Sequence, residues 1–76
     1  MKVVIKLFAQ YRDGRFSKKE IELFGGTRID TVIEKVGLDL ERYPLGIVLV
    51  NGRHADTDSV LKEGDILSLF PKVGGG

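Results

Sequence analysis

The first residues of the chain alternate between two sets of side chains. One set is Val3, Ile5 and Leu7. The residues between them form the other set, and this period of two predicts a half-buried strand over residues 2–8. Asp13-Gly14 marks a turn, after which the alternation resumes over residues 19–24. We therefore expect an N-terminal β-hairpin.

A change of period after Gly25-Gly26 predicts one helix. Thr27 is the expected N-cap, with Asp30 as the acidic half of a capping-box-like pair. The apolar residues that follow are Ile29, Val32, Ile33 and Val36. Their spacing of i, i+3, i+4 and i+7 forms the stripe of an amphipathic helix. Gly37 can adopt the left-handed conformation that ends a helix, so we expect Leu38 to fold back onto the last turn.

The second half of the chain predicts short elements. They are a crossing loop over 39–44, a strand over 46–50, a returning strand over 53–55, a helical turn within 56–62 and a last strand over 66–70. Asn51-Gly52 is the preferred pair for a two-residue type I′ turn, which predicts a hairpin there. Val60 and Leu61 are expected to lie beneath the helical turn.

The order of elements, ββαββ, limits the architecture. One short helix cannot cover both faces of a sheet, so one face is expected to be covered and the other open to water. A mixed sheet that grips one helix is the β-grasp arrangement of the α+β class, with the first and last strands parallel at its centre. We expect a β-grasp domain over residues 1–70 and a flexible tail over 71–76.

Composition removes several classes of function. The net charge of the 76 residues is +1, which gives no electrostatic reason to expect a nucleic-acid partner. Cysteine is absent, so disulfides and thiol nucleophiles are excluded, and the single His54 cannot hold a metal alone. The first residues are too charged for a signal peptide or a membrane span. We expect a cytoplasmic protein with no bound cofactor or metal and no membrane partner.

The tail is the most informative segment. Pro71 cannot donate to a strand ladder, so pairing is expected to end near it. The tail ends in Gly74, Gly75 and Gly76. Without Cβ atoms such residues can thread a narrow tunnel and deliver the α-carboxylate, which ionises near pKa 3.5 and is a poor electrophile until activated. A frayed terminus and a cloning remnant are the alternative explanations.

Two motifs resemble a known family. They are Leu61-x-x-Gly64-Asp65-x-Leu67-x-Leu69-Phe70-Pro71-x-Val73-x-Gly75-Gly76 and Lys6-Leu7-Phe8-Ala9-Gln10-Tyr11-Arg12. With the ββαββ order, the chain resembles the ubiquitin-like sulfur carriers of the molybdopterin-synthase small-subunit and thiamine type. It departs from the molybdopterin branch at Lys72 and Gly74, so the pathway stays open.

The resemblance implies a role for the tail. Gly76 would be adenylated by an E1-like enzyme that uses ATP, and a sulfur donor would convert it to a thiocarboxylate. Gly75 would keep the tail slim, while Phe70, Pro71 and Val73 would fix where it leaves the sheet. The sulfur would pass to an acceptor, such as a synthase large subunit, that makes molybdopterin, tungsten-pterin, thiamine or cysteine. The chain would be a co-substrate and not an enzyme.

Two further hypotheses remain open. The chain could be a ubiquitin-like modifier that is conjugated through Gly76, or a non-covalent β-grasp interaction module with an inert tail. Phe8, Phe70 and Val4 are predicted on the open face of the sheet, where an apolar patch often marks a partner site. The alternative is that they close a small core at the sheet edge.

Overall fold

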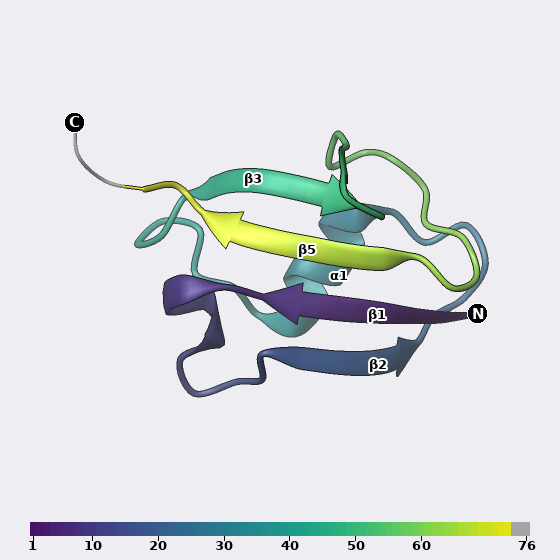
Figure 1. The fold of residues 1–76 in the computed structure, drawn as a ribbon, viewed down its shortest axis with the longest axis horizontal. Coiled ribbons are helices and arrows are strands. Elements are labelled where there is room, and N and C mark those ends of the chain that lie inside the picture. The colour runs from purple at the N-terminus through teal and green to yellow at the C-terminus, as the bar shows by residue number, and fades with distance from the viewer. Residues whose placement is uncertain (74–76) are drawn as a thin grey trace.

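In the part of the chain that the structure describes, five strands form one mixed sheet, and one α-helix packs across one face of it (Figure 1). The structure is a computed structural model that describes residues 1–73. Its elements are β1 (Lys2–Leu7), the 3₁₀ helix η1 (Ala9–Arg12), β2 (Lys18–Glu22), α1 (Ile29–Val36), β3 (Leu45–Val50), β4 (Arg53–His54) and β5 (Ile66–Pro71). The predicted β-grasp fold is confirmed.

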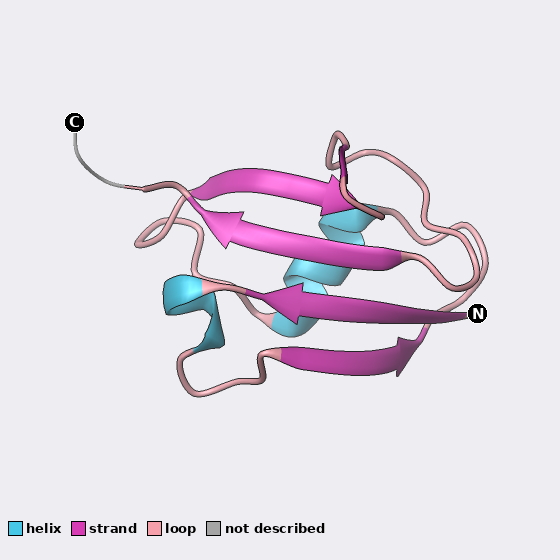
Figure 2. Cartoon of the chain, viewed as in Figure 1, coloured by secondary structure: helices cyan, strands magenta, loops and turns pink. Residues whose placement is uncertain are grey.

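The strand order in the sheet is β2-β1-β5-β3-β4. The first and last strands, β1 and β5, are parallel and occupy its centre, as predicted. The pairs β1–β2 and β3–β5 are antiparallel (Figure 2), and so is the short pair β3–β4. This topology places the C-terminal ends of β1 and β5 at the same end of the sheet, beside the start of β3.

The core lies between the sheet and α1. The sheet contributes the predicted inward residues of β1 and their counterparts on β5, and the helix contributes its apolar stripe. The residues with less than one-tenth of their surface exposed include Val3, Ile5, Leu7, Leu67, Leu69, Ile29, Val32 and Ile33. Each such side chain contributes roughly 1.5–3 kcal/mol of burial free energy. Because alternate residues of β1 and β5 enter the core, the residues between them lie on the open face of the sheet.

The predicted N-cap of the helix is wrong. Arg28 is the N-cap, and the hydroxyl of Thr27 donates to the Phe24 carbonyl over 2.6 Å. Backbone carbonyls from the loop before β5 accept the first helical N–H groups instead: Ile29 donates to Ser59 (3.0 Å) and Asp30 to Thr57 (2.8 Å). Because tertiary contacts satisfy these donors, the helix needs no side-chain cap.

Asp30 pairs with its neighbour rather than with a capping hydroxyl. Two hydrogen bonds from the Arg28 guanidinium, of 2.6 and 3.2 Å, reach its carboxylate. These bonds lower the pKa of Asp30 and raise the pKa of Arg28. The capping-box prediction assigned Asp30 to the wrong partner.

The helical turn predicted within residues 56–62 is present only as one hydrogen-bonded turn, and no residue of this segment is helical. The N–H of Ser59 donates to the Asp56 carbonyl over 3.0 Å and closes a turn at residues 57–58. After this turn the chain is extended, and an isolated antiparallel bridge joins Val60 to Arg28. Leu61 is buried as expected, at 2% exposure, whereas Val60 is 54% exposed. Successive side chains of an extended segment point to opposite sides, so Val60 and Leu61 cannot both face the core.

The predicted turn residues are confirmed. Gly37 is left-handed (φ 79°), and its N–H and that of Leu38 return to the Ile33 carbonyl. Asn51 and Gly52 both have positive φ, 52° and 82°, as a type I′ turn requires. Neither helix in residues 1–73 has the length and apolar character needed to span a lipid bilayer.

Candidate functional site

The base of the tail is held by β3. The last register pair of β5 joins Pro71 to Leu45, and the N–H of Lys72 then donates to the Pro44 carbonyl over 2.7 Å. Pairing therefore ends near Pro71, as predicted. Pro71 is buried, whereas Val73 is 91% exposed, so the chain leaves the folded domain between these residues.

Gly46 allows this close approach. It is the extra residue of an irregularity in β3, where the register steps from Leu45–Pro71 to Ile47–Phe70. A Cβ at position 46 would lie only 2.7 Å from the Cα and backbone nitrogen of Lys72. This role of Gly46 was not predicted from the sequence. A glycine inside an apolar strand, which often marks a bulge or a close backbone approach, was the available signal.

A buried tyrosine supports the same region. The hydroxyl of Tyr11, in η1, donates to the Tyr43 carbonyl over 2.7 Å. Tyr43 precedes Pro44, whose carbonyl accepts the N–H of Lys72. Burial raises the pKa of Tyr11, because the ionised phenolate would lose its solvation. Neither η1 nor this anchor was predicted from the sequence.

An apolar patch lies beside the tail base on the open face. The rings of Phe8 and Phe70 are stacked, with centroids 4.1 Å apart and planes inclined by 11°. Ile47 lies opposite Phe70 on β3 and is 44% exposed. We call Phe8, Ile47 and Phe70 the tail-base patch. The predicted juxtaposition of the two phenylalanines is confirmed, and their role in partner binding stays a prediction.

Val4 lies farther along the same face. It is opposite Ile66, while the pair formed by Lys6 and Ser68 separates it from the tail-base patch. The structure thus puts Val4 on the predicted face without bringing it to Phe8 and Phe70. The other predicted site residues, Gly74, Gly75 and Gly76, lie outside the described residues.

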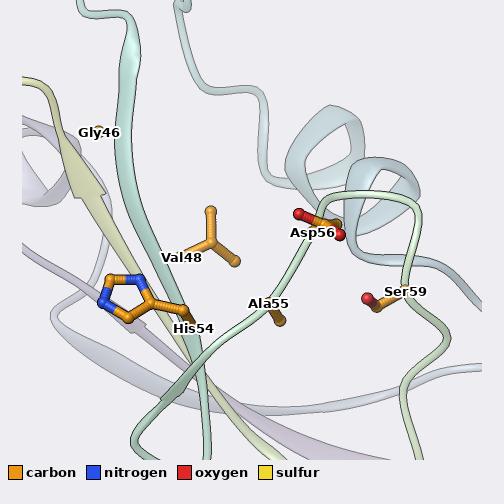
Figure 3. A pocket seen from close by; sticks show the side chains of 6 residues that line it. All are labelled: Gly46, Val48, His54, Ala55, Asp56 and Ser59. Carbon is orange, nitrogen blue, oxygen red and sulfur yellow. The ribbon is translucent and has the colours of Figure 1, made fainter.

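A hollow lies on the other side of β3. It has a volume of about 420 Å³ and is lined by Gly46, Val48, His54, Ala55, Asp56 and Ser59. The His54 ring points away from Asp56 and Ser59 (Figure 3). Among residues 1–73, no hydrogen bond joins these three side chains, so the hollow contains no assembled nucleophile and base.

Solved structures of similar proteins cover almost the whole chain. A putative molybdopterin converting factor subunit 1 from Pyrococcus furiosus is 32% identical, with a TM-score of 0.73, and the match covers 96% of this chain and 99% of that one. SAMP1 from Haloferax volcanii is 28% identical over all of both chains, with a TM-score of 0.75.

A third structure is a complex of subunits 1 and 2 of molybdopterin-converting factor from Helicobacter pylori 26695. The match to a chain of this complex covers all of both chains at 22% identity, with a TM-score of 0.66, and supports the fold alone. The model of the ThiS family matches residues 5–76. This range includes all but the first four residues of the β-grasp domain, together with the tail base and the tail. The chain therefore belongs to the ThiS family, the ubiquitin-like group to which its two sequence motifs pointed.

Proposed function

We propose that this chain is a covalent sulfur carrier whose reactive group is the Gly76 carboxylate. One observation carries the proposal: the family match runs through the glycine tail, over residues 5–76. The geometry of the tail base supports it. Hydrogen bonding of Lys72 to Pro44 and the close packing at Gly46 give the tail a defined starting point and direction.

The chemistry begins with activation of the carboxylate. An E1-like adenylyltransferase joins Gly76 to the α-phosphate of ATP, and pyrophosphate leaves. A donor at the oxidation level of sulfide then attacks the carbonyl carbon. The new C–S bond forms as the bond to AMP breaks, and the proton on sulfur passes to solvent. The product is a thiocarboxylate, so ATP and the sulfur donor are needed by the partners and not bound by this domain.

The tail-base patch gives the activating enzyme a surface to hold. Stacked Phe8 and Phe70 expose an apolar area directly beside the point where the tail leaves β5. A partner that covers this area receives the tail in one direction, which lowers the entropic cost of placing its end in an active site. An acceptor, such as a synthase large subunit in molybdopterin, tungsten-pterin or thiamine synthesis, would use the same surface.

Intact-mass measurement tests the proposal. The chain is incubated with ATP, a sulfide source and a cognate E1-like enzyme, and a variant lacking Gly76 serves as the control. We expect a mass gain equal to the exchange of one oxygen for sulfur, present in the full chain and absent from the deletion. An unchanged mass with an enzyme that is active on its own carrier would contradict the proposal.

A second candidate function rests on the match to SAMP1. A related structure from the same organism is described as small archaeal modifier protein 1. In this alternative, a lysine amine of another protein attacks the adenylate and forms an isopeptide bond with Gly76. Adding lysine-rich acceptor protein to the same incubation separates the two functions, because only a modifier yields a conjugate that survives thiol reduction.

A further inference from the structure

A groove runs between the edge strand β2 and the helix α1. Two neighbouring hollows form it, of about 320 and 260 Å³, and Glu22 and Lys35 line both of them. The floor of the first is apolar, with partly buried Phe16, Ile21 and Val36. At the far end of the second hollow lies Phe24, which is 87% exposed. Large apolar side chains therefore mark both ends of the groove.

The backbone of β2 is open along this groove. Met1 and Leu23 exchange hydrogen bonds of 2.7 and 2.8 Å, and the N–H of Leu7 donates to Ser17 over 3.0 Å. In an antiparallel ladder, bonded and non-bonded pairs alternate. The N–H and C=O groups of Lys18, Glu20 and Glu22 therefore point outward. Because β2 is the end strand of the sheet, no strand within residues 1–73 pairs with them.

The charges along the groove favour an acidic partner. Lys19 and Lys35 line the first hollow against the single carboxylate of Glu22. The ammonium of Lys19 lies 5.7 Å from the centre of the Phe16 ring, at the edge of the apolar floor. An acidic side chain that entered beside an apolar one would meet a cation at either end of this hollow.

We propose that the groove binds an extended acidic segment of a partner protein, which adds a strand to the outer edge of β2. Alternate side chains of an added strand point to the same side, so branched aliphatic residues at every second position would enter the groove. Outward backbone groups at Lys18, Glu20 and Glu22 would bond the segment, and acidic residues at the groove-facing positions next to the aliphatic ones would face Lys19 and Lys35.

This surface is separate from the tail. In the sheet order, β1 lies between β2 and β5, and the tail leaves from the end of β5 beside β3 (Figure 1). A segment bound at β2 would leave the tail-base patch uncovered. The inference therefore stands apart from the proposed sulfur chemistry, and it can be tested on a chain that lacks Gly75 and Gly76.

The test uses a fluorescein-labelled peptide in which valine alternates with threonine and a run of glutamates follows. Anisotropy should give a dissociation constant on the order of 100 µM, as expected for a small transient interface. Glu20→Pro removes an outward N–H without breaking the β1–β2 ladder and should weaken binding at least about tenfold. Glu20→Ala is the matched control and should stay within about twofold.

Two exposed positions give a test that does not depend on the folding of the proline variant. Phe24→Ser and Lys35→Glu should each weaken binding about fivefold, as should a peptide with lysines in place of glutamates. Deletion of Gly75 and Gly76 should leave the affinity unchanged. Equal binding by all variants, or no saturable binding up to about 2 mM, overturns the proposal. So does a peptide-independent dimer in light scattering that Glu20→Pro abolishes, because the occupant would then be a second copy.

Discussion

At the scale of single residues, Gly46 controls how closely the tail approaches β3. A methyl group at this position would lie 2.7 Å from two backbone atoms of Lys72 and 2.8 Å from the Pro71 carbonyl carbon. Backbone cannot swing aside as a flexible side chain can. We therefore expect Gly46→Ala to lower the free energy of unfolding by about 1–3 kcal/mol, the usual cost of overpacking. Urea denaturation measures this change.

The matched control for Gly46→Ala is Gly25→Ala. A Cβ at Gly25 would meet nothing within 4 Å, and this glycine does not have a positive φ. Gly25→Ala should therefore keep or slightly raise stability. Amide chemical shifts should change at Lys72 and Val73 only in the Gly46 variant. Equal stability of the two variants would show that the tail base adjusts freely.

At the scale of elements, Tyr11 couples η1 to the loop that receives Lys72. Tyr11→Phe removes its bond to the Tyr43 carbonyl and should cost about 1 kcal/mol of unfolding free energy near neutral pH. Burial raises the pKa of Tyr11 above its ordinary value of 10.0, so the unfolded chain loses this proton first as pH rises. The stability advantage of the native chain over Tyr11→Phe should therefore be constant below about pH 9 and shrink above about pH 10.

Urea titrations of the native chain and of Tyr11→Phe at several pH values measure this difference in unfolding free energy. The other ionisable groups contribute almost equally in both proteins, so their effects largely cancel. Tyr43→Phe is a suitable control, because it leaves the accepting carbonyl in place. If the difference stays constant or grows at alkaline pH, the protonated Tyr11 hydroxyl does not stabilise the folded state, and the prediction is wrong.

The elements that the sequence predicted are those specified by local pattern. The alternation around Ile5 and the spacing around Val32 identify the core faces, and the conformational preferences of Gly37 and Asn51-Gly52 identify the turns. These signals need no knowledge of distant contacts. The juxtaposition of Phe8 and Phe70 followed once the central strands were paired correctly.

The elements that were missed depend on partners far along the chain. Carbonyls of Thr57 and Ser59 cap the helix, so local capping residues were a misleading guide. The 3₁₀ helix η1 begins at Ala9, whose φ is positive, and is anchored by Tyr11 to a residue 32 positions away. Gly46 matters only because Lys72 packs against it. Each of these features is decided by tertiary contacts rather than by propensity.

At the scale of the whole molecule, the two faces of the sheet have different tasks. One face packs on α1 and carries the stability, while the open face is free to present an apolar surface where the tail begins. A substitution at Ile47 can change the tail-base patch without changing the core, because Ile47 is 44% exposed and lies opposite Phe70. Ile47→Ser should change the free energy of unfolding by less than about 1 kcal/mol.

The effect of Ile47→Ser on activation should be larger. If the adenylating enzyme grips the tail-base patch equally in the ground and transition states, KM should rise about tenfold with little change in kcat. Pyrophosphate exchange measures both constants. Val60→Ser is the matched control, since Val60 is 54% exposed and bridges to Arg28 at the start of the helix, away from the open face. Equal KM values for the two variants would contradict this prediction and place the enzyme contact outside the tail-base patch.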